Sequence, residues 1–114
     1  MNPIGNSLDH YEVLTDYAVF HPTGEVTLAE AVELVTQAIV LTRTQEIRKL
    51  FVSTLGLTGF PVPTLAERFF LIGEWAEASR GMVRVAMVAR PEIIDPEKIG
   101  VLMGNNRGFN AEIF

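Results

Sequence analysis

The feature that most constrains the fold is the tetrapeptide Thr-Leu-Ala-Glu, which occurs at 27–30 and again at 64–67. In each copy the threonine side chain can accept from the backbone amide three residues on, while the glutamate reaches back to the threonine amide. This capping box predicts a helix start at both places. Since no other self-similarity accompanies the two copies, local helix chemistry explains them better than a duplication.

Each predicted helix start is followed by a helical pattern and then by a short apolar run. The run IRKLFVSTL (47–55) is β-branched and aromatic, and MVRVAMVAR (82–90) has almost no polar interruption. Short apolar runs separated by helices are typical of parallel strands buried on both faces. Apolar residues after Thr27 recur at three- and four-residue steps, which predicts a helix with one buried face: Leu28, Ala31, Val32, Val35, Ala38, Ile39 and Thr42.

The two ends of the chain complete the pattern. Residues 11–26 predict a hairpin or bent strand pair around Thr15 and Asp16. Near the other end, Asp95 as N-cap and Pro96 at the first helical position predict a helix over 94–108, and NAEIF a final strand.

The resulting order, ββαβαβαβ, predicts a single α/β domain over residues 1–114. We expect a single-layer mixed, mostly parallel sheet flanked by helices, with right-handed crossovers. Residues 1–10 are expected to form a flexible N-terminal arm.

Composition excludes several functions. The chain of 114 residues has no cysteine, which excludes disulfides, thiolate metal sites and cysteine nucleophiles. A net charge of −5 without a basic run argues against nucleic acid as a partner. The sequence shows neither a signal peptide nor a membrane-spanning segment, so we expect a cytoplasmic protein without membrane insertion.

A ligand of such a sheet would sit at the carboxyl ends of its strands, which here bring together residues 21–24, 53–64 and 90–95. No G-x-S-x-G elbow accompanies His21, so we expect a structural histidine rather than a catalytic one. A metal site made by His10 and His21 is disfavoured because they are 11 residues apart with no carboxylate at a matching offset. No cofactor or metal is predicted.

The helix start at Thr64 presents free amides and a positive dipole end, where an anion could bind with Arg68 or Arg90 nearby. A plain N-cap explains Thr64 equally simply and is favoured. The glycines match neither G-x-G-x-x-G nor a Walker A loop.

The second helix carries two apolar stripes on roughly opposite sides. One is expected to face the sheet: Leu65, Phe69, Ile72, Gly73 and Ala76. The other either packs under a neighbouring helix or the N-terminal arm, or forms a partner surface: Leu71, Trp75 and Ala78. From this second stripe we predict a homodimer with Trp75 near its two-fold axis.

Three stretches together carry a family resemblance: HPTGEVTLAEAVELV, KLFVSTLGLTG and VRVAMVARPE. Over residues 11–114 the sequence resembles the STAS family, the domain of anti-sigma factor antagonists and sulfate-transporter tails. Within it, the sequence is most similar to an uncharacterised bacterial branch of STAS-like and lipid-binding Sec14-like sheets. The resemblance implies a non-enzymatic module that binds a protein partner, sometimes switched by phosphorylation of a serine in a D-S-x-G loop. Here Pro61 and Val62 stand where the acid and serine would be, which leaves Thr58 and Thr64 as hydroxyls.

The leading functional hypothesis is therefore a STAS-like interaction module without chemistry of its own. In it, Phe60 and Val62 either shape a contact surface or plug the end of the core. A carrier of a small apolar ligand or lipid is the alternative, and less favoured is a small hydrolase-type enzyme using His21, Glu92 or Asp95. The predicted binding loop and its surroundings comprise Thr58, Phe60, Val62, Thr64, Arg68, His21 and Arg90.

Overall fold

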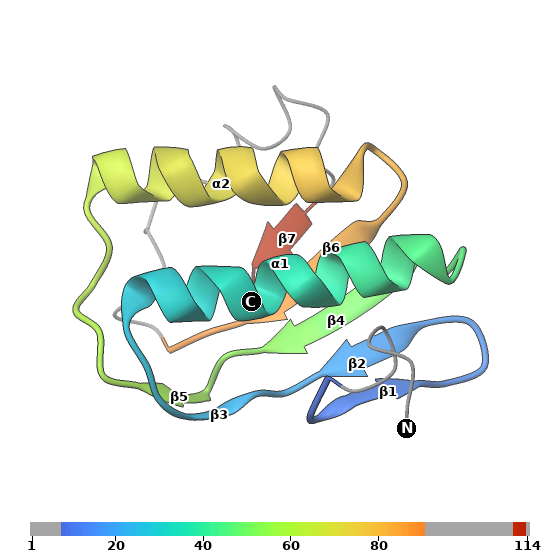
Figure 1. Ribbon diagram of the computed structural model, residues 1–114, viewed down its shortest axis with the longest axis horizontal. Coiled ribbons are helices and arrows are strands. Elements are labelled where there is room, and N and C mark those ends of the chain that lie inside the picture. Colours follow the sequence, from blue (N-terminus) through green and yellow to red (C-terminus); the bar gives the residue numbers. More distant parts are fainter. Residues whose placement is uncertain (1–7, 91–110, 114) are drawn as a thin grey trace.

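A computed structural model of the chain, described over residues 8–90 and 111–113, is an α/β fold with a mixed sheet and two helices (Figure 1). The predicted helix over 94–108 lies outside the described residues, as does nearly all of the predicted N-terminal arm. The described elements, in chain order, are β1 (Tyr11–Val13), β2 (Ala18–Phe20), β3 (Thr23–Glu25), α1 (Leu28–Thr44), β4 (Lys49–Ser53), β5 (Gly56–Thr58), α2 (Leu65–Ser79), β6 (Arg84–Val88) and β7 (Ala111–Ile113).

The main sheet has the strand order β1-β2-β4-β6-β7. The predicted hairpin is confirmed: β1 pairs antiparallel with β2, and the Leu14 amide donates to the Tyr17 carbonyl at 2.8 Å to close the turn. From β2 onward the pairings β2–β4, β4–β6 and β6–β7 are parallel. The final strand predicted from NAEIF is present as β7.

A second, two-stranded parallel sheet of β3 and β5 was not predicted from the sequence. The Val26 amide extends it by donating to the Thr58 carbonyl at 2.7 Å. Next in the chain, Gly59 has a φ of +101°, and a Cβ placed on it would lie 2.7 Å from the Val26 carbonyl oxygen. The small sheet thus fixes the start of the loop that leads from β5 to α2.

Both helices begin with the predicted capping box. The amides of Glu30 and Glu67 donate to Thr27 Oγ1 and Thr64 Oγ1 at 3.1 Å. In return, the two threonine amides donate to the glutamate carboxylates at 2.8 Å. Local sequence therefore sets both helix starts.

The two helices pack side by side on one face of the main sheet (Figure 1). The core lies between them and alternate strand residues such as Phe20, Leu50 and Val85. The expectation that β4 and β6 are buried on both faces is wrong, since Lys49, Phe51 and Arg84 are exposed. These strands alternate because the described helices cover only one face.

The predicted orientation of α2 is wrong for Leu65 and Phe69, which are exposed, whereas Ile72 is buried and Ala76 packs partly buried against the core, as expected. The buried residues include the whole stripe that was expected to face away from the sheet, namely Leu71, Trp75 and Ala78. The premise of a homodimer through Trp75 is thereby removed, because Trp75 is only 8% exposed.

Of the alternatives for this stripe, packing under a neighbouring helix is confirmed, and that helix is α1. The Trp75 indole Nε1 donates to the Val32 carbonyl at 3.3 Å, so the largest side chain of α2 is buried with its polar atom satisfied. Small residues at Ala78 and Ser79 let the end of α2 approach α1 closely, where Arg43 Nε donates to the Ala78 carbonyl at 2.9 Å.

Candidate functional site: an apolar pocket beside an apolar patch

The parallel strands β4 and β6 point toward the side on which both helices begin, the left of Figure 1. The strand ends are joined by Thr54, whose amide and hydroxyl donate to the Val88 carbonyl at 2.9 and 3.3 Å. As expected for such a sheet, a cavity lies at this edge.

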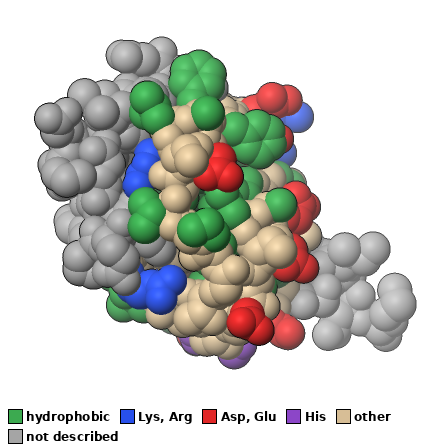
Figure 2. All heavy atoms as spheres, turned by 90° about the vertical axis from the view of Figure 1, so that its left-hand side faces the viewer, with side chains coloured by type: hydrophobic (Ala, Val, Ile, Leu, Met, Phe, Trp, Pro, Cys, Tyr) green, Lys and Arg blue, Asp and Glu red, His purple; other side chains and the backbone are tan. Residues whose placement is uncertain are grey.

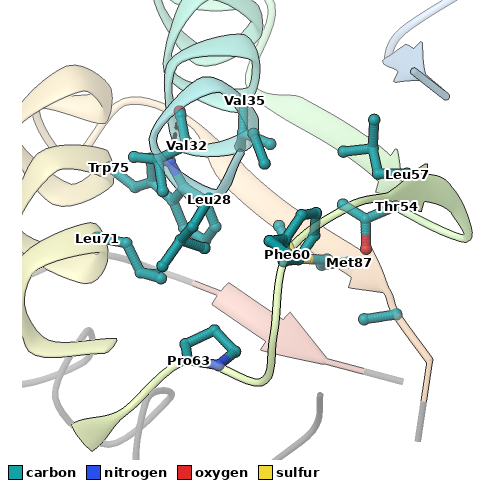
Figure 3. A pocket seen from close by; sticks show the side chains of 12 residues that line it. Leu28, Val32, Val35, Thr54, Leu57, Phe60, Pro63, Leu71, Trp75 and Met87 are labelled. Atoms are coloured by element: carbon teal, nitrogen blue, oxygen red, sulfur yellow. Dashed lines mark hydrogen bonds between the residues drawn. The ribbon is translucent and has the colours of Figure 1, made fainter. Parts of the chain in front are cut away.

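This cavity, hereafter the apolar pocket, has a volume of about 70 Å³. Figure 3 shows side chains from both helices and from the loop before α2 converging on it. Its walls include Leu28 and Val32 from α1, Leu71 and Trp75 from α2, and Phe60 and Pro63 from the loop.

The polar groups of the pocket's described lining already have partners within the protein. Thr54 Oγ1 donates to the Val88 carbonyl, and Trp75 Nε1 donates to the Val32 carbonyl. A polar ligand would lose its hydrogen bonds to water here without replacement, so the lining favours hydrocarbon.

The loop residues Phe60 and Val62 have different environments. Phe60 is half-buried and lines the pocket, whereas Val62 is 48% exposed. Plugging the core and shaping a surface were alternatives for the pair, and the structure assigns the first to Phe60 and leaves Val62 available for the second.

A group of exposed apolar side chains, hereafter the α2 patch, follows directly along the chain. Its members are Val62 and, on α2, Leu65 at 60%, Phe69 at 52% and Phe70 at 61% exposed. In Figure 2 apolar side chains gather over the beginning of α2, with both acidic and basic side chains beside them. Phe70 belongs to neither predicted stripe and was not predicted as a site residue. Two adjacent phenylalanines on a helix that needs only one buried face could have indicated that one of them is exposed.

The α2 patch borders a shallow groove of about 400 Å³. Ala66, Phe69, Phe70 and Gly73 line it at the helical spacing i, i+3, i+4 and i+7. Further along the same side of α2, Glu74 and Glu77 also line the groove, so its far end is acidic.

The anion site considered at Thr64 has an unfavourable geometry. The Thr64 and Glu67 amides are both used by the capping box, and the negative Glu67 carboxylate at the helix start would repel an anion. Arg68 and Arg90 are each half-buried. Thr58 is exposed on β5, and its hydroxyl donates to the Gly24 carbonyl at 3.5 Å.

The structure brings His10 and His21 together, although they are distant in sequence. Their ring centroids are 5.3 Å apart, and the His21 amide donates to the His10 carbonyl at 3.1 Å. The separation of His10 and His21 by 11 residues in the sequence was therefore a poor argument against a metal site formed by both. Within residues 8–90 and 111–113, however, no three histidine, cysteine or acidic side chains are grouped to hold a metal.

Comparison with known proteins gives no family assignment: neither a family model nor a curated protein matches the sequence. In the described part of the chain, neither helix has the length and hydrophobicity needed to span a membrane.

Proposed function

We propose that this protein is a non-enzymatic, STAS-like interaction module that binds a protein partner through the α2 patch. The observation that carries the proposal is the exposure of Leu65, Phe69 and Phe70, each by more than half, within two turns of one helix. Contiguous exposed apolar surface of this kind marks interaction sites, and exposed aromatic residues are typical anchors.

The negative charge beside the α2 patch indicates which kind of partner it binds. Glu67 is exposed at the start of α2, and Glu74 and Glu77 are exposed along the groove. A basic segment with apolar anchors complements this surface. In a homodimer through the same patch, two-fold symmetry would bring like-charged carboxylates close together, so a different, basic partner is favoured over a second copy.

The size of the apolar pocket argues against a lipid carrier. Sites that enclose a drug-sized ligand have volumes of about 300–1,000 Å³. The pocket, at about 70 Å³, is several times smaller than that range. For the hydrolase alternative, His21 is exposed beside His10, while Glu92 and Asp95 lie outside the described residues.

Peptide display on the full chain tests the proposal. Random peptides are selected on the wild-type protein, and the affinity of each enriched peptide is then measured for Phe70→Ser and Met82→Ser. Met82 is a matched control because it is 59% exposed but lies in the turn after α2, at the other end of the helix.

We expect enriched peptides to combine apolar residues with lysine or arginine. Loss of an aromatic anchor should weaken their binding roughly tenfold or more in Phe70→Ser, with no change in Met82→Ser. Failure to enrich any peptide, or equal affinity for both variants, would contradict the proposal.

A further inference from the structure

We infer that the apolar pocket is a binding site for one short aliphatic group, and that this group is the anchor side chain of the partner bound on the α2 patch. The second half of the inference rests on the proposed function; the first does not. Three observations support it: the chemistry of the lining, the volume, and the loop that the pocket shares with the patch.

The lining admits hydrocarbon and little else. Leu28, Val32 and Leu71 are aliphatic, and the Thr54 and Trp75 polar atoms donate to backbone carbonyls. Among the described lining residues, a charged or hydroxylated group would find no side chain free to hydrogen-bond with it, which is costly. An aliphatic group would instead gain van der Waals contacts with the apolar side chains that line the pocket.

Volume sets the size of the group. An engineered apolar cavity of about 150 Å³ stays dry and holds one benzene molecule. The pocket measures about 70 Å³, roughly half of that volume. It therefore excludes an aromatic ring and suits a branched group of a few carbons, such as the end of a leucine, isoleucine or valine side chain.

The loop between β5 and α2 connects the pocket to the α2 patch. Phe60 and Pro63 line the pocket, while Val62 between them belongs to the patch. Pro61 and Pro63 restrict the backbone of this loop, so both surfaces are held in place before a partner arrives. A peptide lying over Val62 is thus next to the pocket wall.

The first experiment tests the pocket without any partner. Methyl resonances of the full chain are recorded by NMR with xenon and, separately, with benzene. We expect xenon to shift the methyl signals of Leu28, Val32 and Leu71 and to leave Val13 unchanged, and benzene to have no such effect.

Two variants change the pocket in opposite directions. Ala31 lines the pocket, so Ala31→Leu should fill it and abolish the xenon shifts. Leu28→Ala should enlarge it and admit benzene, with a change in the fluorescence of Trp75, the single tryptophan of the chain. Wild-type protein without xenon shifts, or Leu28→Ala that still excludes benzene, would overturn the inference.

The second experiment identifies the occupant, using a peptide enriched on the wild-type protein. We expect that replacing one aliphatic residue of this peptide by alanine weakens binding roughly tenfold or more, and that Ala31→Leu weakens the parent peptide to a similar extent. Phe70→Ser could weaken binding while neither the alanine substitution in the peptide nor Ala31→Leu in the protein changes it. In that case the inference about the anchor fails and the proposed function stands. If no peptide is enriched, the proposed function and the anchor both fail, and the xenon result alone decides whether the pocket binds an aliphatic group.

Discussion

The two helices begin with the same four residues, in the same cap geometry, yet the leucines of the two copies have different environments. Thr27 and Thr64 have nearly identical backbone angles, with φ −78° and ψ 166° against φ −71° and ψ 169°. Leu28, however, is half-buried and lines the apolar pocket, whereas Leu65 is 60% exposed.

This difference shows which features are local and which depend on tertiary packing. A capping box needs only side chains and amides within one helical turn, so it forms wherever its residues occur. Burial of the following leucine depends on what the rest of the chain places beside it. On α2, the residues left exposed are those on which we base the proposed binding surface.

The largest predicted effect concerns the two sides of α2. Trp75→Ala should lower the free energy of unfolding by about 3–5 kcal/mol, because it removes a buried aromatic side chain and its hydrogen bond to Val32. Phe70→Ala should change it by less than about 0.5 kcal/mol, since Phe70 is an exposed residue. Urea unfolding followed by far-ultraviolet circular dichroism measures both. Equal losses would show that the two sides contribute alike to the core.

The next prediction concerns the loop that precedes the second helix. Gly59→Ala should destabilise the fold by more than about 1 kcal/mol, because alanine is strained at the positive φ of Gly59 and its Cβ would lie 2.7 Å from the Val26 carbonyl oxygen. Gly24→Ala is the matched control: its φ is also positive, at +125°, but nothing lies within 4 Å of a Cβ there. The loss measured in urea should be larger at Gly59, and a larger loss at Gly24 would contradict the contact argument.

The caps themselves should be energetically equivalent. Thr27→Ala and Thr64→Ala should each cost about 1 kcal/mol of unfolding free energy, since each removes the same bond to a glutamate amide. Chemical denaturation of the two variants under one set of conditions compares them directly. A difference well above the size of one cap would mean that tertiary contacts act already at the helix start.

The smallest effect is expected at alkaline pH, at the far end of α1. Burial raises the pKa of Tyr11, and the hydrogen bond with Thr42 Oγ1 at 2.9 Å lowers it by a smaller amount. Between the usual tyrosine pKa near 10 and the raised pKa, the folded protein keeps a proton that the unfolded chain has released. Stability should therefore fall as pH rises through this window. Tyr11→Phe should reduce the slope of unfolding free energy against pH, and an unchanged slope would exclude Tyr11 as its source.

Features with a local cause could be predicted from the sequence. Both capping boxes and the first hairpin depend on residues close together in the chain, and all of them are present. The small sheet of β3 and β5 was missed because three-residue strands carry almost no periodic signal.

The orientation of α2 could not be predicted because both of its stripes are apolar. Only the fit of Trp75 and Ala78 against α1 decides between them. Two members of the α2 patch, Leu65 and Phe69, were consequently predicted to face the sheet although they are exposed. The predicted binding loop is partly retained, with Phe60 in the pocket and Val62 in the patch.

Mapping where an enriched peptide binds shows whether α2 uses one side for the core and the other for a basic partner. Backbone amide chemical shifts of the full chain are followed by NMR while an enriched peptide is added. Our account predicts that the largest changes fall in residues 60–77, on the loop and the exposed side of α2. Changes concentrated instead at the hairpin near His10 and His21, or on the exposed sheet face around Phe51, would contradict it.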